Sequence, residues 1–217
     1  MNYLALPCSD ARYDYSPAIA NKILDIFDFA IQTRARSLFI RFDLKFPDDG
    51  FAYDKAEIFR SFMRTFIQDR TRQGFGDLYY VAVRARNRSK HGQYHVFILL
   101  NGKNTQSLNG HMEKAKDLWT KSFSDESSRA GLFSCRSHDE NNGLMIHRDA
   151  PDFVATVTEC IKQALYLATV ETKDWLSKHG RTWSSTTNIP RGRRDAFFVP
   201  DFPKASLSDL ESPSLET

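Results

Sequence analysis

Hydrophobic positions along the chain recur at helical spacing in four stretches. Ser16 and Pro17 form an N-cap and first-turn pair, and the apolar positions after them predict a helix to about residue 34. Ile58, Phe62 and Phe66 mark a second amphipathic helix ending near residue 74. The same spacing predicts helices over about residues 105–123 and 151–178.

Other stretches alternate between apolar and polar positions, which is the pattern of a strand with two different faces. Residues 37–45 alternate in this way, and residues 78–86 and 93–101 form two further strands separated by the polar loop NRSKHG. We expect the last two to be adjacent and antiparallel. Two short strand candidates, at about residues 132–136 and 144–147, are compatible with a second hairpin.

This order of elements predicts an α+β fold, with a central antiparallel sheet of about five strands and helices packed on one face. We expect a helical segment over residues 1–36 packed on the core, a main domain over 37–187, and a tail over 188–217 that is first basic and then acidic. The last dozen residues are expected to be disordered, because they are polar and aperiodic.

Composition narrows the class of protein. The chain has 217 residues, of which 41% are hydrophobic, enough for one sizeable core. We expect a cytoplasmic protein without membrane contact, since the sequence has no long apolar run and no secretory pattern at its start. Its cysteines, at positions 8, 135 and 160, lack the spacing of a thiolate zinc site. The net charge of +3 does not by itself indicate DNA binding.

The segment HGQYHVFILLNG, residues 91–102, has the most informative polar positions. Alternation within this strand puts Gln93 and His95 on one face together with Phe97 and Leu99. A lone histidine in an apolar strand is commonly a hydrogen-bonded structural residue. The adjacent Gln93 leaves a ligand role open as well.

This strand resembles the His-hydrophobic-His strand of HUH endonucleases, and the wider pattern resembles the YagK/YfjJ family, related to the replication initiators of filamentous phages. The similar segments cover roughly residues 37–187. They are RFDL at 41–44, VRA at 83–85, the strand ending LLNG, Trp119, YLATVETK at 166–173 and GRTWSS at 180–185.

The resemblance implies a divalent metal, Mn²⁺ or Mg²⁺, that polarises a DNA phosphate, and a helix-borne tyrosine that attacks it. Tyr166 is the candidate nucleophile, with Lys173 two helical turns further on as a possible proton partner. The candidate metal ligands are His95, Gln93 and Asp43.

The sequence departs from the HUH pattern at three positions. Gln93, Ala85 and Thr169 stand where a histidine, a carboxylate and a lysine are expected. A neutral amide is a weak ligand and alanine offers none, so the site is expected to bind metal poorly or not at all.

Several basic and aromatic residues are candidates for DNA contact. On the predicted helical wheel Tyr166 falls off the buried stripe and beside Lys162. The full set of DNA-contact candidates is Arg41, Arg84, Lys162, Arg181, Trp183, Arg191, Arg193 and Arg194. Some have ordinary alternatives: Arg41 is compatible with an ion pair to Asp43, and the tail arginines of IPRGRRD are compatible with a solvated loop. An ordinary, partly exposed helix tyrosine is likewise an alternative for Tyr166.

The resemblance implies a DNA-binding, replication-initiator-like protein of a phage, prophage or satellite element, and the departures from its pattern imply that strand cleavage is lost or weakened. Its expected partners are single-stranded or hairpin DNA and the replication proteins of the phage or host. One alternative is an active nickase that forms a 5′-phosphotyrosyl intermediate. Another is a regulator of mobile-element replication that acts through a protein partner.

Overall fold

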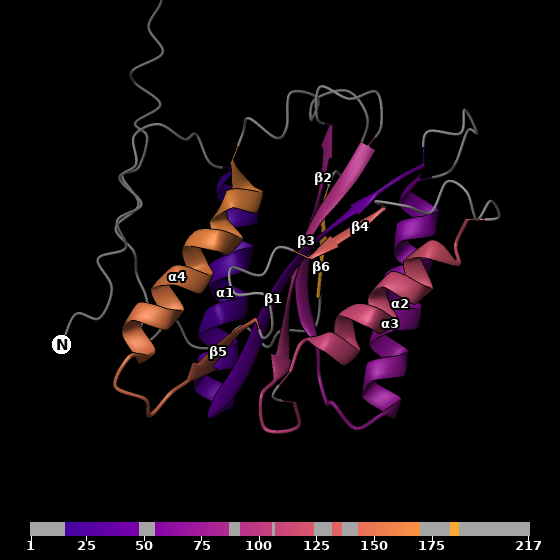
Figure 1. The fold of residues 1–217 in the computed structure, drawn as a ribbon. Coiled ribbons are helices and arrows are strands. Elements are labelled where there is room, and N and C mark those ends of the chain that lie inside the picture. Colours follow the sequence, from indigo (N-terminus) through magenta and orange to yellow (C-terminus); the bar gives the residue numbers. More distant parts are fainter. Residues whose placement is uncertain are drawn as a thin grey trace, which may run out of the picture.

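The computed structural model describes residues 16–47, 55–86, 92–105, 107–123, 132–135, 143–169 and 183–186 (Figure 1). In chain order the elements are α1 (Pro17–Thr33), β1 (Arg36–Lys45), α2 (Lys55–Arg72), β2 (Tyr79–Arg86), β3 (Gly92–Asn101), α3 (Asn109–Thr120), β4 (Phe133–Cys135), β5 (Leu144–His147), α4 (Phe153–Leu165), the 3-10 turn η2 (Tyr166–Ala168) and β6 (Trp183–Ser185).

The strands form one antiparallel sheet in the order β4-β1-β3-β2-β6, with β5 also paired to β1. The central pair, β1 and β3, is in register from Ser37 opposite Asn101 to Lys45 opposite Gln93. The predicted antiparallel pairing of β2 with β3 is confirmed. The two short strands do not form a second hairpin: β5 pairs with Arg36–Phe39 and β4 with Phe42–Leu44, so both extend the free edge of β1.

Helices cover both faces of the sheet. Helices α1 and α4 lie on one side, and α2 and α3 on the other (Figure 1). The α+β class and the antiparallel sheet are confirmed, but the expected placement of all helices on one face is wrong. The physical reason is that both faces of β3 are apolar along most of its length: Phe97 and Leu99 face α1 and α4, while Val96 and Ile98 face α2 and α3.

The last helix is shorter than its apolar spacing predicts. Helix α4 ends at Leu165, Tyr166–Ala168 tighten into a 3-10 turn, and Thr169 is extended. The Thr169 hydroxyl donates to the Tyr166 carbonyl, and the Ser16 backbone N–H donates to the Ala168 carbonyl at 2.8 Å. These bonds satisfy carbonyl groups that would otherwise be left unpaired at the helix end, and the backbone leaves the helix here.

The sequence did not predict β6, which pairs with the outer edge of β2. A strand of three residues has too few positions for alternation to be recognised. Among the described residues, none of the helices has the length and apolar character needed to cross a membrane. The expected disordered end of the tail lies outside the described residues.

Candidate functional site

Near one end of the sheet, the face toward α1 and α4 changes from apolar to polar. Along β1 the aromatic Phe39 is followed on this face by Arg41 and Asp43. Along β3, Phe97 is opposite Arg41, and His95 and Gln93 follow it on the same face. Asp43 and His95 are directly opposite each other. They belong to a row of directly opposed residues, one from each of the strands β4, β1, β3, β2 and β6. In that order the residues are Ser134, Asp43, His95, Val83 and Trp183.

A buried hydrogen bond joins the two central members of this row. His95 Nδ1 lies 2.6 Å from Asp43 Oδ1, and the two residues are only 4% and 1% exposed. Because a carboxylate can only accept, we assign the Nδ1 proton to the imidazole. Nε2 of a neutral His95 is then an acceptor, and the Gln93 side-chain amide donates to it at 3.2 Å. The ring is therefore held at both nitrogens.

Tyr166 covers this pair from the end of α4. Its ring is edge-on to His95, with centroids 6.3 Å apart at 78°. The guanidinium carbon of Arg41 lies 4.6 Å from the centroid of the same ring, within cation–π range. Arg41 Nη1 also donates to the Gln163 carbonyl at 3.3 Å, which ties β1 to α4. We call Arg41, Asp43, Gln93, His95 and Tyr166 the strand-end cluster.

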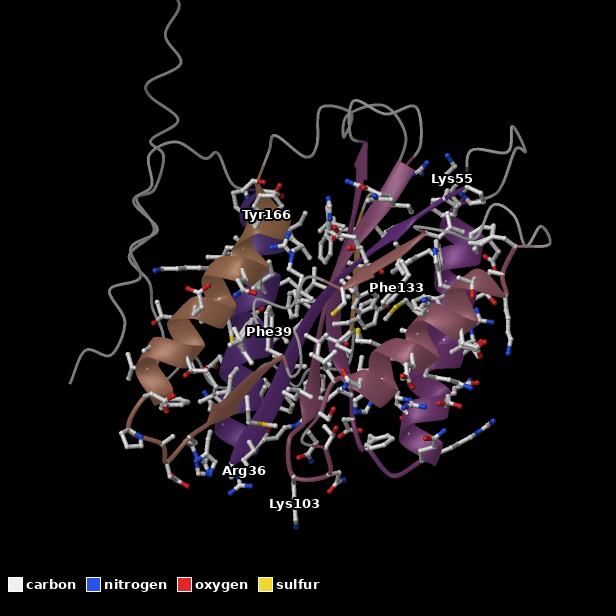
Figure 2. The ribbon with its side chains drawn as sticks, viewed as in Figure 1. Arg36, Phe39, Lys55, Lys103, Phe133 and Tyr166 are labelled. Carbon is white, nitrogen blue, oxygen red and sulfur yellow. The ribbon has the colours of Figure 1, made fainter. Side chains whose placement is uncertain are left out.

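Tyr166 is the solvent-facing member of the cluster. It is 42% exposed, whereas Leu165 and Leu167 on either side are buried. Figure 2 shows it at the end of α4, far from Arg36 and Lys103 at the opposite end of the molecule. The η2 turn holds the Tyr166 backbone, so an exposed aromatic ring is presented from a fixed position.

A family model, the YagK/YfjJ C-terminal domain, matches residues 3–181. The chain belongs to this family. The resemblance to it in the sequence is thus confirmed, and the further relation to HUH endonucleases stays a prediction. The matched stretch contains the strand-end cluster and every described element except β6. No curated protein and no solved structure matches the chain.

The structure of this YagK/YfjJ domain brings most of the predicted metal and catalytic candidates together. Asp43, Gln93, His95 and Tyr166 are all in the strand-end cluster. Lys173, the remaining catalytic candidate, lies outside the described residues. The open alternative of a hydrogen-bonded structural histidine also fits His95, since both of its ring nitrogens have partners.

The DNA-contact candidates are distributed over both faces. Arg41 is in the cluster, Lys162 is exposed one helical turn before Tyr166, and Trp183 is on the same sheet face as His95. Arg84 lies on the opposite face, because it pairs with Tyr94, whose ring stacks on Phe59 of α2. Arg181, Arg191, Arg193 and Arg194 lie outside the described residues.

Sequence reasoning missed two members of this neighbourhood. Ser134 is exposed on β4 directly opposite Asp43, and the Gln163 carbonyl anchors Arg41. The alternation of Phe133 and Ser134 is a weak signal for the first. Nothing in the sequence indicates the second, because a backbone carbonyl carries no residue-specific pattern.

The cluster does not fit the Mn²⁺ or Mg²⁺ site that the HUH resemblance implies. Such ions favour several oxygen ligands, including carboxylates. Here an oxygen of the Asp43 carboxylate is hydrogen-bonded to His95 Nδ1. The remaining candidate metal ligands are one imidazole nitrogen, His95 Nε2, and the neutral side-chain amide of Gln93 beside it. In the part of the chain that is described, no three His, Cys, Asp or Glu side chains gather closely enough to hold a metal ion.

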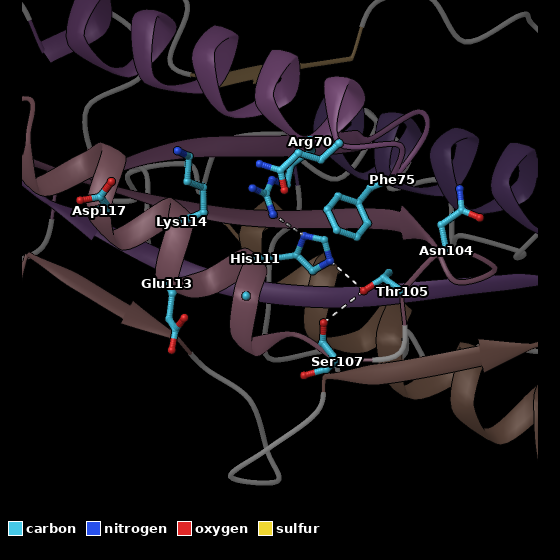
Figure 3. A pocket seen from close by; sticks show the side chains of 11 residues that line it. Arg70, Phe75, Asn104, Thr105, Ser107, His111, Glu113, Lys114 and Asp117 are labelled. Atoms are coloured by element: carbon cyan, nitrogen blue, oxygen red, sulfur yellow. Dashed lines mark hydrogen bonds between the residues drawn. The ribbon is translucent and has the colours of Figure 1, made fainter.

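A second polar cluster lines a groove of about 640 Å³ between α2 and α3 (Figure 3). The Thr105 hydroxyl donates to the Ser107 carbonyl, so it accepts from His111 Nε2 at 2.7 Å. His111 Nδ1 is then an acceptor, and Arg70 donates to it at 3.4 Å. Burial, together with the Arg70 charge, lowers the pKa of His111 to about 4. These side chains satisfy one another's hydrogen-bonding groups, so we interpret the groove as a structural contact between α2 and α3.

Proposed function

We propose that this protein binds single-stranded or hairpin DNA at the strand-end cluster, as a replication-initiator-like protein of a phage, prophage or satellite element. The observation that carries the proposal is the exposed Tyr166 ring stacked on the Arg41 guanidinium beside the Asp43–His95 pair. It also rests on the resemblance of the strand bearing His95 to HUH endonucleases.

The chemistry of the cluster suits a nucleotide. An aromatic ring stacks on any base in a sequence-tolerant way, at about 1–3 kcal/mol per base. An arginine beside the ring supplies positive charge for the backbone phosphate. Lys162 is exposed on the same helix as Tyr166, and Trp183 lies two strands from His95, about 10 Å across the sheet. Val83 lies between His95 and Trp183 and is buried, so Trp183 is a second, separate aromatic side chain at this end of the sheet.

Strand cleavage is expected to be weak or lost. Gln93 occupies the position where HUH endonucleases have a second histidine, and Asp43 is directed at His95. Metal-assisted cleavage is therefore not part of the proposed function. Cleavage remains a second candidate function because Tyr166 sits directly against His95. Its hydroxyl oxygen would form a bond to phosphorus as the bond from phosphorus to the 3′ oxygen breaks, which leaves a 5′-phosphotyrosyl bond. The hydroxyl proton would pass to water, and the released 3′ oxygen would take a proton from water.

A role through a protein partner finds less support. Among the described residues the large hydrophobic side chains that are exposed are Val154 and Tyr166, at opposite ends of the α4–η2 segment. They do not form the extended apolar patch that marks many protein interfaces.

The test is a native gel with labelled single-stranded and hairpin oligonucleotides, followed by a denaturing gel with and without Mn²⁺. We expect a salt-sensitive mobility shift that Tyr166→Ala weakens about tenfold and Val154→Ala leaves unchanged. A covalent adduct lost in Tyr166→Phe would establish the nickase instead. Absence of any shift for either DNA would refute the proposed function.

A further inference from the structure

We infer that Arg41 is the cation that holds a DNA phosphate in the strand-end cluster, so that binding there needs no divalent metal ion. This inference rests on the proposed function and specifies how the phosphate is held. The inference is drawn from the ring of Tyr166, which contacts both Arg41 and His95.

Arg41 is fixed in position before any ligand binds. It projects from the middle of β1, where Phe97 is its partner on β3. Its Nη1 donates to the Gln163 carbonyl, and its Cζ packs over the Tyr166 ring. A planar guanidinium held in this way loses little conformational entropy on binding an anion. Because Arg41 is half-buried, its charge is also less screened than that of a fully exposed arginine.

The hydrogen bonds of the neighbouring groups disfavour a metal ion at His95. One oxygen of the Asp43 carboxylate is engaged by the His95 Nδ1 proton. Gln93 presents its side-chain amide nitrogen to His95 Nε2, a geometry in which the histidine lone pair is already used. A metal ion at Nε2 would have to displace this bond, whereas a phosphate on Arg41 leaves it intact.

The experiment measures binding of fluorescent oligothymidylate by anisotropy at several NaCl concentrations, once in EDTA and once in Mn²⁺. The variants are Arg41→Gln, Arg41→Lys and, as a matched control, Arg64→Gln. Arg64 is an exposed arginine of α2, on the opposite face of the sheet. Thermal denaturation of each variant confirms that it folds.

The wild type is expected to bind equally well, within about twofold, in EDTA and in Mn²⁺. Arg41→Gln should weaken binding about tenfold or more, as expected for one charged hydrogen-bonded contact. It should also reduce the salt slope by about 0.7, the value for one phosphate contact on a single strand. Arg41→Lys should bind with an affinity between those of the wild type and Arg41→Gln. Arg64→Gln should bind as tightly as the wild type.

Binding that requires Mn²⁺, or that is unaffected by both Arg41 substitutions, would overturn the inference while leaving the proposed function in place. No binding by the wild type under any condition would overturn the proposed function itself. If Arg41→Gln does not fold, the EDTA comparison and Arg41→Lys still decide the inference.

Discussion

His95 donates a 2.6 Å hydrogen bond from Nδ1 to Asp43 Oδ1, directly across the central β1–β3 pair. Both side chains are buried, so neither can exchange its partner for water without opening the sheet. The bond orients the imidazole on which the Tyr166 ring rests. The geometry of the proposed DNA site therefore depends on a pair that also contributes to the stability of the fold.

Removing the charge from this pair should destabilise the protein measurably. We expect Asp43→Asn to lower the free energy of unfolding by about 2 kcal/mol at neutral pH, as found for buried hydrogen bonds to charged groups. Urea denaturation of the wild type and the variant measures this difference in the free energy of unfolding. The control is Asp117→Asn, which breaks the exposed Lys121–Asp117 pair and should cost less than about 0.5 kcal/mol. Equal effects of the two substitutions would contradict the assigned role of Asp43.

The ring of Tyr166 should matter more than its hydroxyl. Its contacts with Arg41 and His95 are made by the ring. We therefore expect Tyr166→Phe to bind single-stranded DNA within about twofold of the wild type, and Tyr166→Leu, which keeps bulk without a π face, to bind about tenfold more weakly. Anisotropy titrations measure both. Equal loss in both variants would assign binding to the hydroxyl.

Replacing Gln93 should create a metal site. Gln93→His places two imidazoles on one strand face, and register puts position 85 opposite position 93. We expect the double variant Gln93→His, Ala85→Glu to gain a Mn²⁺-dependent thermal stabilisation that the wild type lacks. At a metal concentration of 100 times Kd this amounts to about 2.7 kcal/mol. No stabilisation would mean that these positions do not converge on a metal.

Acid should destabilise the protein at the contact between α2 and α3. The pKa of His111 is lowered from the ordinary 6.5 to about 4, mainly by burial and further by the Arg70 charge. Between these values the unfolded chain binds more protons than the folded protein, so stability falls as the pH falls from 6.5 to 4, by up to about 3 kcal/mol. Denaturation at several pH values should show this slope flattened in His111→Gln but kept in His147→Gln. A slope unchanged in His111→Gln would refute the assignment.

The sequence predicted the main strands and the face on which each polar side chain lies, because a period of two is unambiguous over nine or ten residues. Arg41 and Asp43 could therefore be assigned to one face of their strand, and Gln93 and His95 to one face of theirs, before their contacts were known. The pairing that joins the two faces was not predicted. The exposure of Tyr166 also followed from helical spacing alone.

The features that it did not predict depend on tertiary contacts. Helix α4 ends at Leu165 because Thr169 and Ser16 bond to carbonyls of the following turn, and Ser16 is about 150 residues away in the chain. The stacking of Arg41 on Tyr166 likewise joins a strand to a distant helix. Pairing of β4 and β5 with β1 was hidden by their short length.

The most direct test of DNA binding at the strand-end cluster is to locate bound DNA on the protein. An oligothymidylate carrying 5-iodouracil, irradiated with the protein in EDTA, links to aromatic side chains that it contacts, and mass spectrometry of the digested product identifies them. We predict an adduct on Tyr166, with Trp183 as the second site on the same sheet face. Adducts confined to Phe75 or Tyr80, on the side of α2 and α3, would contradict it.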